Sequence, residues 1–521
     1  MKYNVSKLVT ASLIFLLSTS LVACSTESEE DTQTLTLGCS NFSDSLDPSA
    51  SPNSAWGTAR YGIGETLFKF DDSMNAQPNL ADSYTVDDTK TVWEFHIRDN
   101  VKFSNGKDLT ASEVVKSFEY LYEQEANHMG SNTPSQYLEF ESIRADDATG
   151  MVTIVTKKPY ADLTKVLSHV NYIVLDVESD LATSPVGTGP YQVASNNTGV
   201  SLSLVKNENY WNGDVPYENL NVVYMEDSTT KALALQSGDI DMVDSITTAN
   251  DLKILRESDQ FNVSETVSTR TAFTHMNHDG ILGNDTLREA ILLAVDDETI
   301  AEVTVGGVYT PGYSVLPKTL DYGYETLEDK TPYDIEKAKT LLDEAGIVDT
   351  NGDGIRELDG EEIQLKYISY VMKSLDVVSE AVAMNLAELG IGVNLQVLDS
   401  DTHWNMVTAQ EFDLAINSWL TVPVGDPIGY LRNWYSKSDA NYSGYQNETY
   451  DELYEQLVNE IDIATQKDII KQLQQILIDD KAVMVNGYYE SNLSSHSQIE
   501  GVVMPMSESY WITTDIKPIT E

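Results

Sequence analysis

Apolar and polar side chains alternate along the stretch Val92-Trp93-Glu94-Phe95-His96-Ile97-Arg98. Because successive side chains of a β-strand point to opposite faces, its tryptophan, phenylalanine and isoleucine would share one buried face. A turn follows at Ser104-Asn105-Gly106-Lys107. Thr110, with Glu113 three residues later, then predicts a capped helix whose apolar stripe extends to Tyr122. The stretch therefore predicts a half-buried strand, a turn and an amphipathic helix.

The segments on both sides of this strand are more specific than its alternation. In order, the chain reads Leu-Ala-x-Ser-Tyr at 80–84, Trp-x-Phe-x-Ile-Arg at 93–98, Val-Lys-Phe-Ser-Asn-Gly-Lys at 101–107 and Leu-Thr-Ala-x-x-Val at 109–114. This series resembles the solute-binding proteins of family 5, the peptide- and nickel-binding family that serves ABC importers. Further segments typical of that family lie at 187–191, 207–213, 237–242 and 287–295, so the resemblance covers residues 35–515.

The resemblance implies an α/β fold of the periplasmic-binding-protein type, a class II clamshell in its large three-part form. Lobe I would comprise residues 35–69, 186–272 and 499–521, a small inserted subdomain residues 70–185, and lobe II residues 273–498. Apolar periodicity and turn signals agree with an alternation of helices and strands. It predicts helices at 229–236, 285–295, 334–345, 379–389, 450–459 and 466–478, and strands at 35–38, 151–155, 220–225, 393–397 and 412–416.

Length and charge limit the function classes. A chain of 521 residues is too long for one core and suggests two or three lobes. It carries 83 acidic against 32 basic residues, a formal net charge of −51. Such a surface repels nucleic acid and anionic membranes, so neither is an expected partner. We interpret the charge as favouring solubility rather than attracting cationic ligands.

The N-terminal residues have the pattern of a targeting segment. Lys2 and Lys7 precede a short apolar run at 8–22, and Leu21-Val22-Ala23-Cys24 resembles a bacterial lipobox. We therefore expect a signal peptide at 1–23, lipid on Cys24 and a polar tether at 24–34, which would hold the protein on the outer face of the cell membrane. A membrane-spanning helix is the alternative, but the run is shorter than the ~20 residues that cross a bilayer. The other cysteine, Cys39, then has no disulfide partner.

No pattern in the sequence supports catalysis or a bound cofactor. The segment Asp349-Thr350-Asn351-Gly352-Asp353-Gly354 copies the start of a calcium loop, but the twelfth position is Gly360 instead of glutamate. The histidines have no zinc-binding spacing, and no Gly-x-Ser-x-Gly elbow is present. We therefore expect neither an enzyme, nor a metal site, nor a cofactor. A secreted hydrolase remains the alternative from another class.

Two segments carry the candidate binding residues. Residues 417–427 follow the predicted strand at 412–416 as a loop, where open α/β sheets place their ligands. By resemblance, Trp419 in this loop packs on the ligand, and Trp56 and Tyr61 border the cavity; ordinary core aromatics are the alternative for the last two. The candidate ligand-binding residues are Trp419, Trp56, Tyr61, Arg60, Asp426, Trp404 and Tyr445.

The resemblance leaves the cargo open between a short peptide and a nickel chelate. Peptide-binding members have an aspartate three residues after the tryptophan, where this chain has Val422; Asp426 follows four residues later. Chelate-binding members use arginines of the small lobe, and here Asn171 takes one such position. We favour a short peptide, with its amino group near Asp426, because the anionic chelator lacks these arginines.

Together these patterns predict a monomeric, lipid-anchored binding protein that closes around a ligand and presents it to an ABC permease. A pheromone receptor or adhesin on the same fold is the remaining alternative. One further local prediction is a tight turn at Gly187-Thr188-Gly189-Pro190-Tyr191, with positive φ at glycine.

Overall fold

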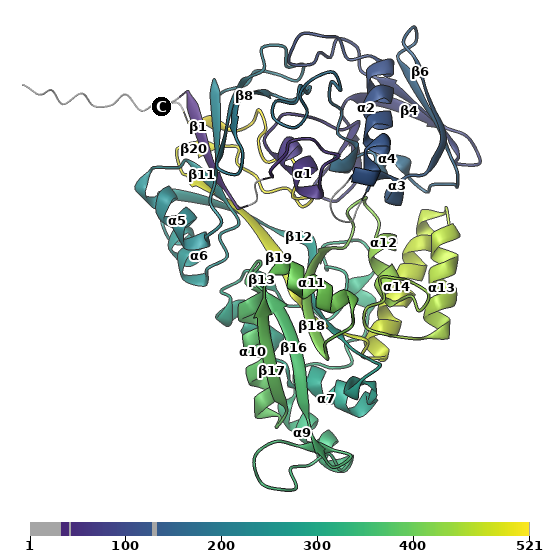
Figure 1. Ribbon diagram of the computed structural model, residues 1–521, viewed down its shortest axis with the longest axis vertical. Coiled ribbons are helices and arrows are strands. Elements are labelled where there is room, and N and C mark those ends of the chain that lie inside the picture. The colour runs from purple at the N-terminus through teal and green to yellow at the C-terminus, as the bar shows by residue number, and fades with distance from the viewer. Residues whose placement is uncertain (1–32, 41–42, 128–132, 520–521) are drawn as a thin grey trace, which may run out of the picture.

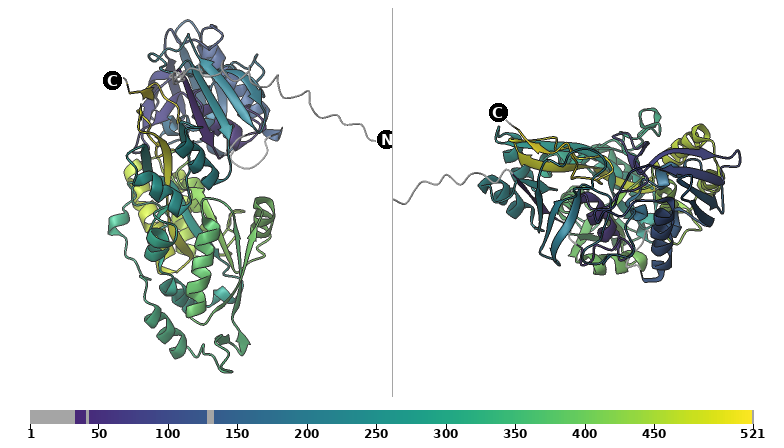
Figure 2. Two further views of the ribbon diagram at one scale, coloured as in Figure 1. Left: turned by 90° about the vertical axis from the view of Figure 1, so that its left-hand side faces the viewer. Right: turned by 90° about the horizontal axis from the view of Figure 1, so that it is seen from above.

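Two bodies lie one above the other in the structure, a computed structural model that describes residues 33–40, 43–127 and 133–519 (Figure 1). Two long strands, β12 (Phe261–Met276) and β19 (Val483–His496), run from one body to the other. We call the body that contains β1 (Thr34–Cys39) lobe I and the body that contains β16 (Gln364–Tyr370) lobe II. The side view shows the same two bodies along the long axis (Figure 2). The predicted two-lobed α/β fold is confirmed.

A single eleven-stranded sheet passes through both lobes, in the order β17-β16-β18-β12-β19-β11-β1-β10-β9-β8, with β13 paired to β19. On the lobe I side, β1 is parallel to β10 and β11; on the lobe II side, β16 is parallel to β17 and β18. The remaining strands are β8 (Tyr191–Asn197), β9 (Ser201–Lys206), β10 (Asn219–Tyr224), β11 (Met242–Asp244), β13 (Tyr309–Thr310), β17 (Gly392–Leu398) and β18 (Leu414–Leu420).

The pairing of the two long strands is interrupted where the lobes meet. Val267 pairs with Glu490 and Thr271 with Tyr488, so three residues of β12 face one residue of β19. Below this break β12 also pairs with β18 of lobe II, and above it β19 pairs with β11 of lobe I. An interrupted ladder bends a strand and raises its twist, which makes this point the natural hinge between the lobes.

The small subdomain has its own four-stranded antiparallel sheet, in the order β4 (Ala81–Val86), β5 (Val92–Ile97), β7 (Met151–Thr156) and β6 (Phe140–Asp146). The three apolar side chains of β5 are buried, as their alternation predicts. Helix α2 (Ala111–Glu123) begins after Thr110, whose hydroxyl accepts from the Glu113 amide. The Glu113 carboxylate instead binds Lys107 and Lys116, so only half of the predicted capping box forms.

The predicted helices of both lobes are present, with small shifts at their ends. In lobe II, α10 begins at Leu375, four residues earlier than its periodicity indicates, and α9 begins at Ile335, one residue later than predicted, with Asp334 as its cap. The helices are α1 (Pro52–Arg60), α3 (Pro134–Tyr137), α4 (Leu163–Val166), α5 (Ser228–Ser237), α6 (Ala249–Arg256), α7 (Asp285–Ala294), α8 (Asp297–Thr299), α9 (Ile335–Glu344), α10 (Leu375–Glu388), α11 (Ser400–Thr408), α12 (Ile428–Leu431), α13 (Glu448–Asn459) and α14 (Ile463–Asp479). Short strand pairs are β2 (Phe68–Phe70) with β3 (Ala76–Pro78), β14 (Glu357–Leu358) with β15 (Glu361–Glu362), and β20 (Ile499–Glu500) with β21 (Lys517–Pro518).

The prediction of positive φ in the 187–191 turn is wrong. Neither Gly187 nor Gly189 has a left-handed backbone. Both are needed because the chain passes against the backbone at 62–64: a Cβ on Gly187 would lie 2.1 Å from the Ile63 carbonyl oxygen, and one on Gly189 2.3 Å from that of Gly62. A close approach of two backbones, and not a turn conformation, therefore explains these glycines.

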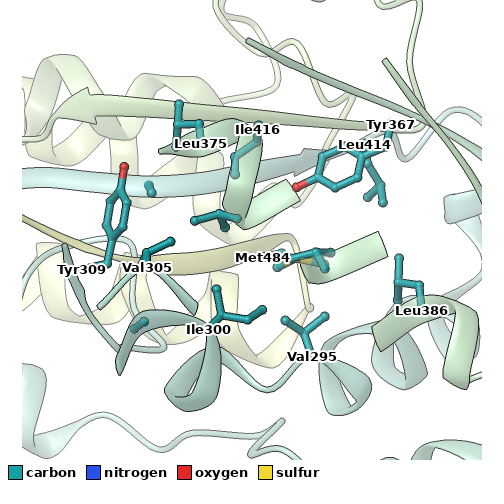
Figure 3. Close-up of a cluster of buried hydrophobic side chains, with 14 of the residues drawn as sticks. Val295, Ile300, Val305, Tyr309, Tyr367, Leu375, Leu386, Leu414, Ile416 and Met484 are labelled. Carbon is teal, nitrogen blue, oxygen red and sulfur yellow. The ribbon is translucent and has the colours of Figure 1, made fainter. Parts of the chain in front are cut away.

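The apolar core is divided into clusters, and the main one extends from lobe II to α5, β11 and α6 of lobe I. The core of lobe II gathers side chains from the sheet and the helices around it, including Tyr309, Leu414, Ile416 and Met484 (Figure 3). The C-terminal segment returns to lobe I, where Trp511 packs with Leu35 and Leu220 in one cluster. Among the described residues, none of the helices combines the length and apolar character needed to cross a bilayer.

Candidate ligand-binding cavity

A cavity of about 900 Å³ lies between lobe II and the small subdomain, beside α1 of lobe I. Its lobe II wall comes from the end of β18, the segment 420–433 and the start of α14; the facing wall comes from the segments 136–137 and 158–171. The volume is within the roughly 300–1,000 Å³ of small-molecule sites. The cavity is therefore large enough to enclose a small ligand between the moving parts of the fold.

Aromatic rings form the lobe II wall. The Trp419 ring stacks on Trp404 of α11, with 5.5 Å between centroids and 19° between planes, and meets the Phe273 ring edge-on at 5.3 Å. Trp419 was expected in a loop. Because β18 continues to Leu420, Trp419 is instead the second-last residue of this strand. Pairing of Trp419 with Thr271 of β12 holds the ring more rigidly than a loop would. The two stacked tryptophans offer a flat apolar surface.

Trp56 of α1 contributes to the facing wall. The Trp56 ring meets the His169 ring edge-on, with 6.0 Å between centroids. The Arg60 guanidinium, one turn further along α1, lies 4.8 Å from the centroid of the Trp56 ring. Burial lowers the pKa of His169 to about 3, so this histidine is neutral at physiological pH. The Trp56 ring thus has an uncharged histidine at one edge and a guanidinium against it.

Four of the seven predicted residues line the cavity: Trp419, Trp56, Trp404 and Asp426. The other three lie elsewhere. Tyr61 packs in the lobe I core with its hydroxyl 3.2 Å from the Cys39 sulfur, which agrees with the core alternative. Arg60 lies behind Trp56, between that ring and Trp511. The Tyr445 hydroxyl donates to Asp480 in lobe II.

Asp426 is a half-buried carboxylate in the lobe II wall of this cavity. Its Oδ1 accepts a hydrogen bond of 2.9 Å from the Ile428 amide. Burial raises its pKa above the ordinary value, and this amide together with Lys165 opposes the shift only in part. A cationic group placed in the cavity would restore the charged form. Val422, in the position where peptide-binding relatives have an aspartate, is instead buried with Met74 and Leu320.

Basic residues outnumber acidic ones in the walls, the reverse of the chain as a whole. Five basic side chains line the cavity against three carboxylates. Three of the five are ion-paired with carboxylates outside the walls, Arg270 with Glu508, Arg432 with Asp439 and Lys467 with Asp321, so the charges around a ligand are nearly balanced in a protein that carries −51 overall. The basic residues are Lys158, Lys165, Arg270, Arg432 and Lys467, and the acidic ones Asp162, Asp426 and Glu460.

Arg270 connects the cavity to the hinge and was missed by sequence reasoning. It lies in the break of the β12–β19 ladder, lines the cavity, and donates from Nη1 to the Ser418 carbonyl at 2.9 Å. Its Nε and Nη2 are each 3.4 Å from the Glu508 carboxylate. In the sequence, Arg270 is the one charged residue of the run 266–274, and no motif around it indicates a binding role.

Glu508 is the buried anion of the hinge and is surrounded by cations. Burial alone would raise its pKa, but Arg270, Lys373 and Arg60 outweigh that effect and hold it well below the ordinary value. Burial lowers the pKa of Lys373 to about 7, and its ammonium lies 3.9 Å from the centroid of the Tyr489 ring. One carboxylate thus balances three basic groups at the point where the lobes join.

Lobe II and the small subdomain touch across the cavity mouth. The Lys90 ammonium donates to the carbonyl of Ala161 and to that of Ile461, each at 3.1 Å. Val424 of lobe II is 7% exposed and belongs to the core cluster of the small subdomain. These contacts hold lobe II against the small subdomain in this structure.

Comparison with known proteins gives a consistent family. Residues 75–442 match the family described as "Bacterial extracellular solute-binding proteins, family 5 Middle". The nickel-binding protein NikA of Staphylococcus aureus is 25% identical over 446 residues, 85% of this chain and 86% of that protein. The oligopeptide-binding protein AppA of Bacillus subtilis is 24% identical over 463 residues, 84% and 82% of the two chains. The crystal structure of NikA from Brucella suis with Fe(III)-EDTA has a TM-score of 0.84 at 20% identity, covering 93% of this chain and 100% of that one.

The family match spans more than half of the chain, and the structural likeness shows the same fold over nearly all of it. This confirms the resemblance carried by residues 80–114. Its relatives are extracytoplasmic solute-binding proteins rather than enzymes. The chain therefore belongs to family 5 of the bacterial extracellular solute-binding proteins and is the substrate-binding protein of an ABC importer.

Proposed function

We propose that the protein captures short peptides in the cavity between lobe II and the small subdomain and delivers them to its permease. The observation that carries the proposal is the presence of opposite charges in one cavity: Asp426 and Arg270 both line it, together with three tryptophans. A peptide has an amino group for the first and a carboxylate for the second. Its apolar side chains fit the flat Trp419 surface.

A nickel chelate is the second candidate. Two close relatives by sequence, including NikA of Staphylococcus aureus, are named as nickel-binding proteins. Asn171 lines the cavity at a position where chelate-binding members have arginine, but Arg270 and Arg432 bring two guanidinium groups to the same cavity. Such groups bind carboxylates of a chelator with good geometry. The peptide remains the favoured cargo because Asp426 would repel an anionic chelator.

The cargo is tested by what the purified protein retains and by calorimetry. Mass spectrometry of ligand released after gentle purification should show short peptides. Titration with a mixed peptide pool should give saturable binding, and titration with nickel–histidine should not. Binding of nickel–histidine together with no retained peptide would reverse the assignment.

The role of Asp426 has a sharper test within the peptide series. Asp426→Asn should weaken binding of a peptide with a free amino group by about 10- to 100-fold, since a hydrogen bond to a charged group is worth roughly 1.5–3 kcal/mol. The N-acetylated form of the same peptide serves as the control. It should bind wild type and variant equally. An equal loss for both peptides would show that Asp426 supports the wall instead of the amino group.

We also propose that Cys24 anchors the protein by lipid to the outer face of the cell membrane, where a monomer would meet the permease. Residues 1–32 lie outside the part of the chain that the structure describes. The proposal rests on the Leu-Val-Ala-Cys sequence at 21–24. Cys24→Ser should move the protein out of the membrane fraction or leave the signal peptide attached. Unchanged fractionation with no lipid on residue 24 would contradict the anchor.

A further inference from the structure

Lys90 of the small subdomain reaches across to lobe II beside the ligand-binding cavity. It lies in the turn between β4 and β5, and its ammonium donates to the Ala161 carbonyl of its own subdomain and to the Ile461 carbonyl of lobe II, each at 3.1 Å. Ala161 lines the cavity, and so do Glu460 and Ile463 on the two sides of the lobe II acceptor. One side chain therefore joins the two walls next to the space that they enclose.

The backbone of Lys90 has a conformation that suits glycine better than lysine. Its φ is +54°, in the left-handed region. The Lys90 amide donates to the Asp87 carbonyl at 3.0 Å, and its carbonyl accepts from the Tyr160 amide and the Trp93 indole N–H, each at 3.1 Å. These three bonds fix the direction of the side chain. Because glycine would relieve the strain and lysine does not, the strained position points to a role for the side chain.

The acceptor on lobe II lies in the short loop between α13 and α14. The next residue, Asp462, caps α14 and accepts from the Thr465 amide at 2.8 Å. Hydrogen bonds from Thr465 lower the pKa of Asp462, and the charge of Lys90 adds to this effect. The loop thus attracts the Lys90 ammonium by its charge and binds it through a backbone carbonyl. One such hydrogen bond changes an equilibrium by about 2- to 10-fold, so the contact matters but can still be broken.

A second lysine of the small subdomain also contacts lobe II. Lys165 of α4 donates to the Gly425 carbonyl at 3.4 Å. Its stem lies against this glycine, whose φ is +77°: a Cβ there would be 2.7 Å from the Lys165 Cδ. The neighbouring Val424 is 7% exposed and packs in the core cluster of the small subdomain. The lobe II loop is therefore docked on α4 by apolar contact and by the second ammonium.

We propose that Lys90 and Lys165 form a clasp that holds the small subdomain on lobe II over the cavity and slows the release of bound ligand. In each bond the donor and the acceptor belong to different bodies, so separating the walls breaks both bonds. The two lysines are positioning residues that act by keeping the walls together. The clasp rests on the proposed use of this cavity for ligand, but not on which cargo fills it.

Thiol labelling of the full mature protein tests the clasp without any ligand. Val424→Cys places a thiol in the contact between the walls, and a water-soluble maleimide should modify it when the walls separate. Adding Lys90→Met, which keeps the stem and removes the ammonium, should raise this rate by about 2- to 10-fold, the scale of one hydrogen bond. Lys157→Met is the matched control, because Lys157 pairs at 3.5 Å with Glu139 inside the small subdomain. It should leave the rate unchanged.

Cys39 provides the internal reference for unfolding, because it is buried in the lobe I core, away from the clasp. Mass spectrometry follows the labelling of each cysteine separately. Faster labelling at position 424 with no change at Cys39 would support the clasp. Faster labelling at both positions would show general unfolding and overturn it. An unchanged rate at position 424 in both Lys90→Met and Lys165→Met would also overturn it.

The effect on release is measured with trileucine as the probe, by stopped-flow tryptophan fluorescence. Dissociation should be about 2- to 10-fold faster from Lys90→Met than from wild type or Lys157→Met. Equal dissociation rates in the three proteins would overturn the role of the clasp in release. If none of the three proteins bound trileucine, the result would count against the peptide assignment, and the labelling at position 424 would still decide the clasp.

Discussion

Trp419 belongs at once to the cavity wall and to the packing of lobe II. Its ring stacks on Trp404 and meets Phe273 and His275 edge-on, while its remaining surface faces the cavity. His275 is buried, and burial lowers its pKa to about 3, so the support behind the tryptophan stays uncharged over the physiological range. A substitution at Trp419 therefore affects both ligand affinity and stability, and the two must be measured separately.

Trp419→Ala should weaken ligand binding by about 1–3 kcal/mol, the usual scale for truncating a central aromatic contact. The substitution should also lower the unfolding temperature, because Trp404 loses the ring on which it stacks. Calorimetry measures the first effect and thermal unfolding the second. Trp211→Ala is the control, since Trp211 is partly buried beside Arg98 and does not line the cavity. It should reduce stability only. Wild-type affinity in Trp419→Ala would place the ligand elsewhere.

Glu508 should make the hinge sensitive to acid. Its pKa in the folded chain lies well below the ordinary value of 4.5, so its contribution to stability is fully present above pH 4.5 and is lost as the pH falls below it. Glu508→Gln leaves Arg270, Arg60 and Lys373 without their anion. We expect a loss of about 3–5 kcal/mol at pH 7, as for other broken buried pairs.

The measurement is urea unfolding of wild type and variant at several pH values. The difference between Glu508→Gln and wild type should shrink as the pH is lowered from 4.5. Glu500→Gln removes an exposed partner of Lys517 and should cost less than about 1 kcal/mol at any pH. A difference for Glu508→Gln that does not change with pH would mean that the charge of Glu508 is not what stabilises the hinge.

At the scale of elements, prediction succeeded where a side-chain period is strict. The β5 strand and the α2 helix follow from alternation and from a cap, which are local properties. The long β12 strand was not predicted. Its serines and threonines show neither the two-residue period of a strand nor the 3.6-residue period of a helix, and its length is set by pairing with β18 and β19. The extension of β18 to Leu420 was missed for the same reason. Long-range pairing has no signature in the strand itself.

The backbone contact between the turn at 187–191 and the residues after α1 also belongs to this scale. Gly189→Ala would place a methyl group 2.3 Å from the Gly62 carbonyl oxygen, and the obstacle is backbone that cannot rotate away. We expect a loss of about 1–3 kcal/mol, as for other overpacked sites. Urea unfolding measures it.

Gly429→Ala is the matched control, because its Cβ would meet nothing within 4 Å and the residue lies in α12. Alanine favours a helix over glycine by roughly 0.5–1 kcal/mol, so this variant should be as stable as wild type or slightly more stable. If both substitutions had the same effect, the close approach would not be what requires Gly189.

At the scale of the whole molecule, the family and the clamshell fold could be predicted from the sequence, whereas some residues of the ligand-binding cavity could not. Trp419 and Trp56 were predicted because the family places aromatics there. Arg270 was not, since it reaches the cavity only through the break between two long strands. Tyr61, directly after α1, was predicted to border the cavity but packs in the lobe I core, because the orientation of a short helix and its end is decided by packing partners far away in sequence.

The contrast between a −51 protein and a cavity whose charges are nearly balanced has a kinetic consequence. Charges on the exterior act over the Debye length, about 30 Å at 0.01 M salt and about 8 Å at 0.15 M, whereas a ligand enclosed in the cavity is shielded from added ions. Raising the salt concentration should therefore speed the association of an acidic peptide and slow that of a basic one. The two dissociation rates should change little.

Stopped-flow tryptophan fluorescence with a matched pair of peptides, differing only in one glutamate or lysine, measures both rates. Equal salt dependence for the two peptides would mean that the exterior does not act on the ligand before contact. Otherwise the acidic exterior selects ligands by their rate of encounter, and the cavity selects them afterwards by their residence time.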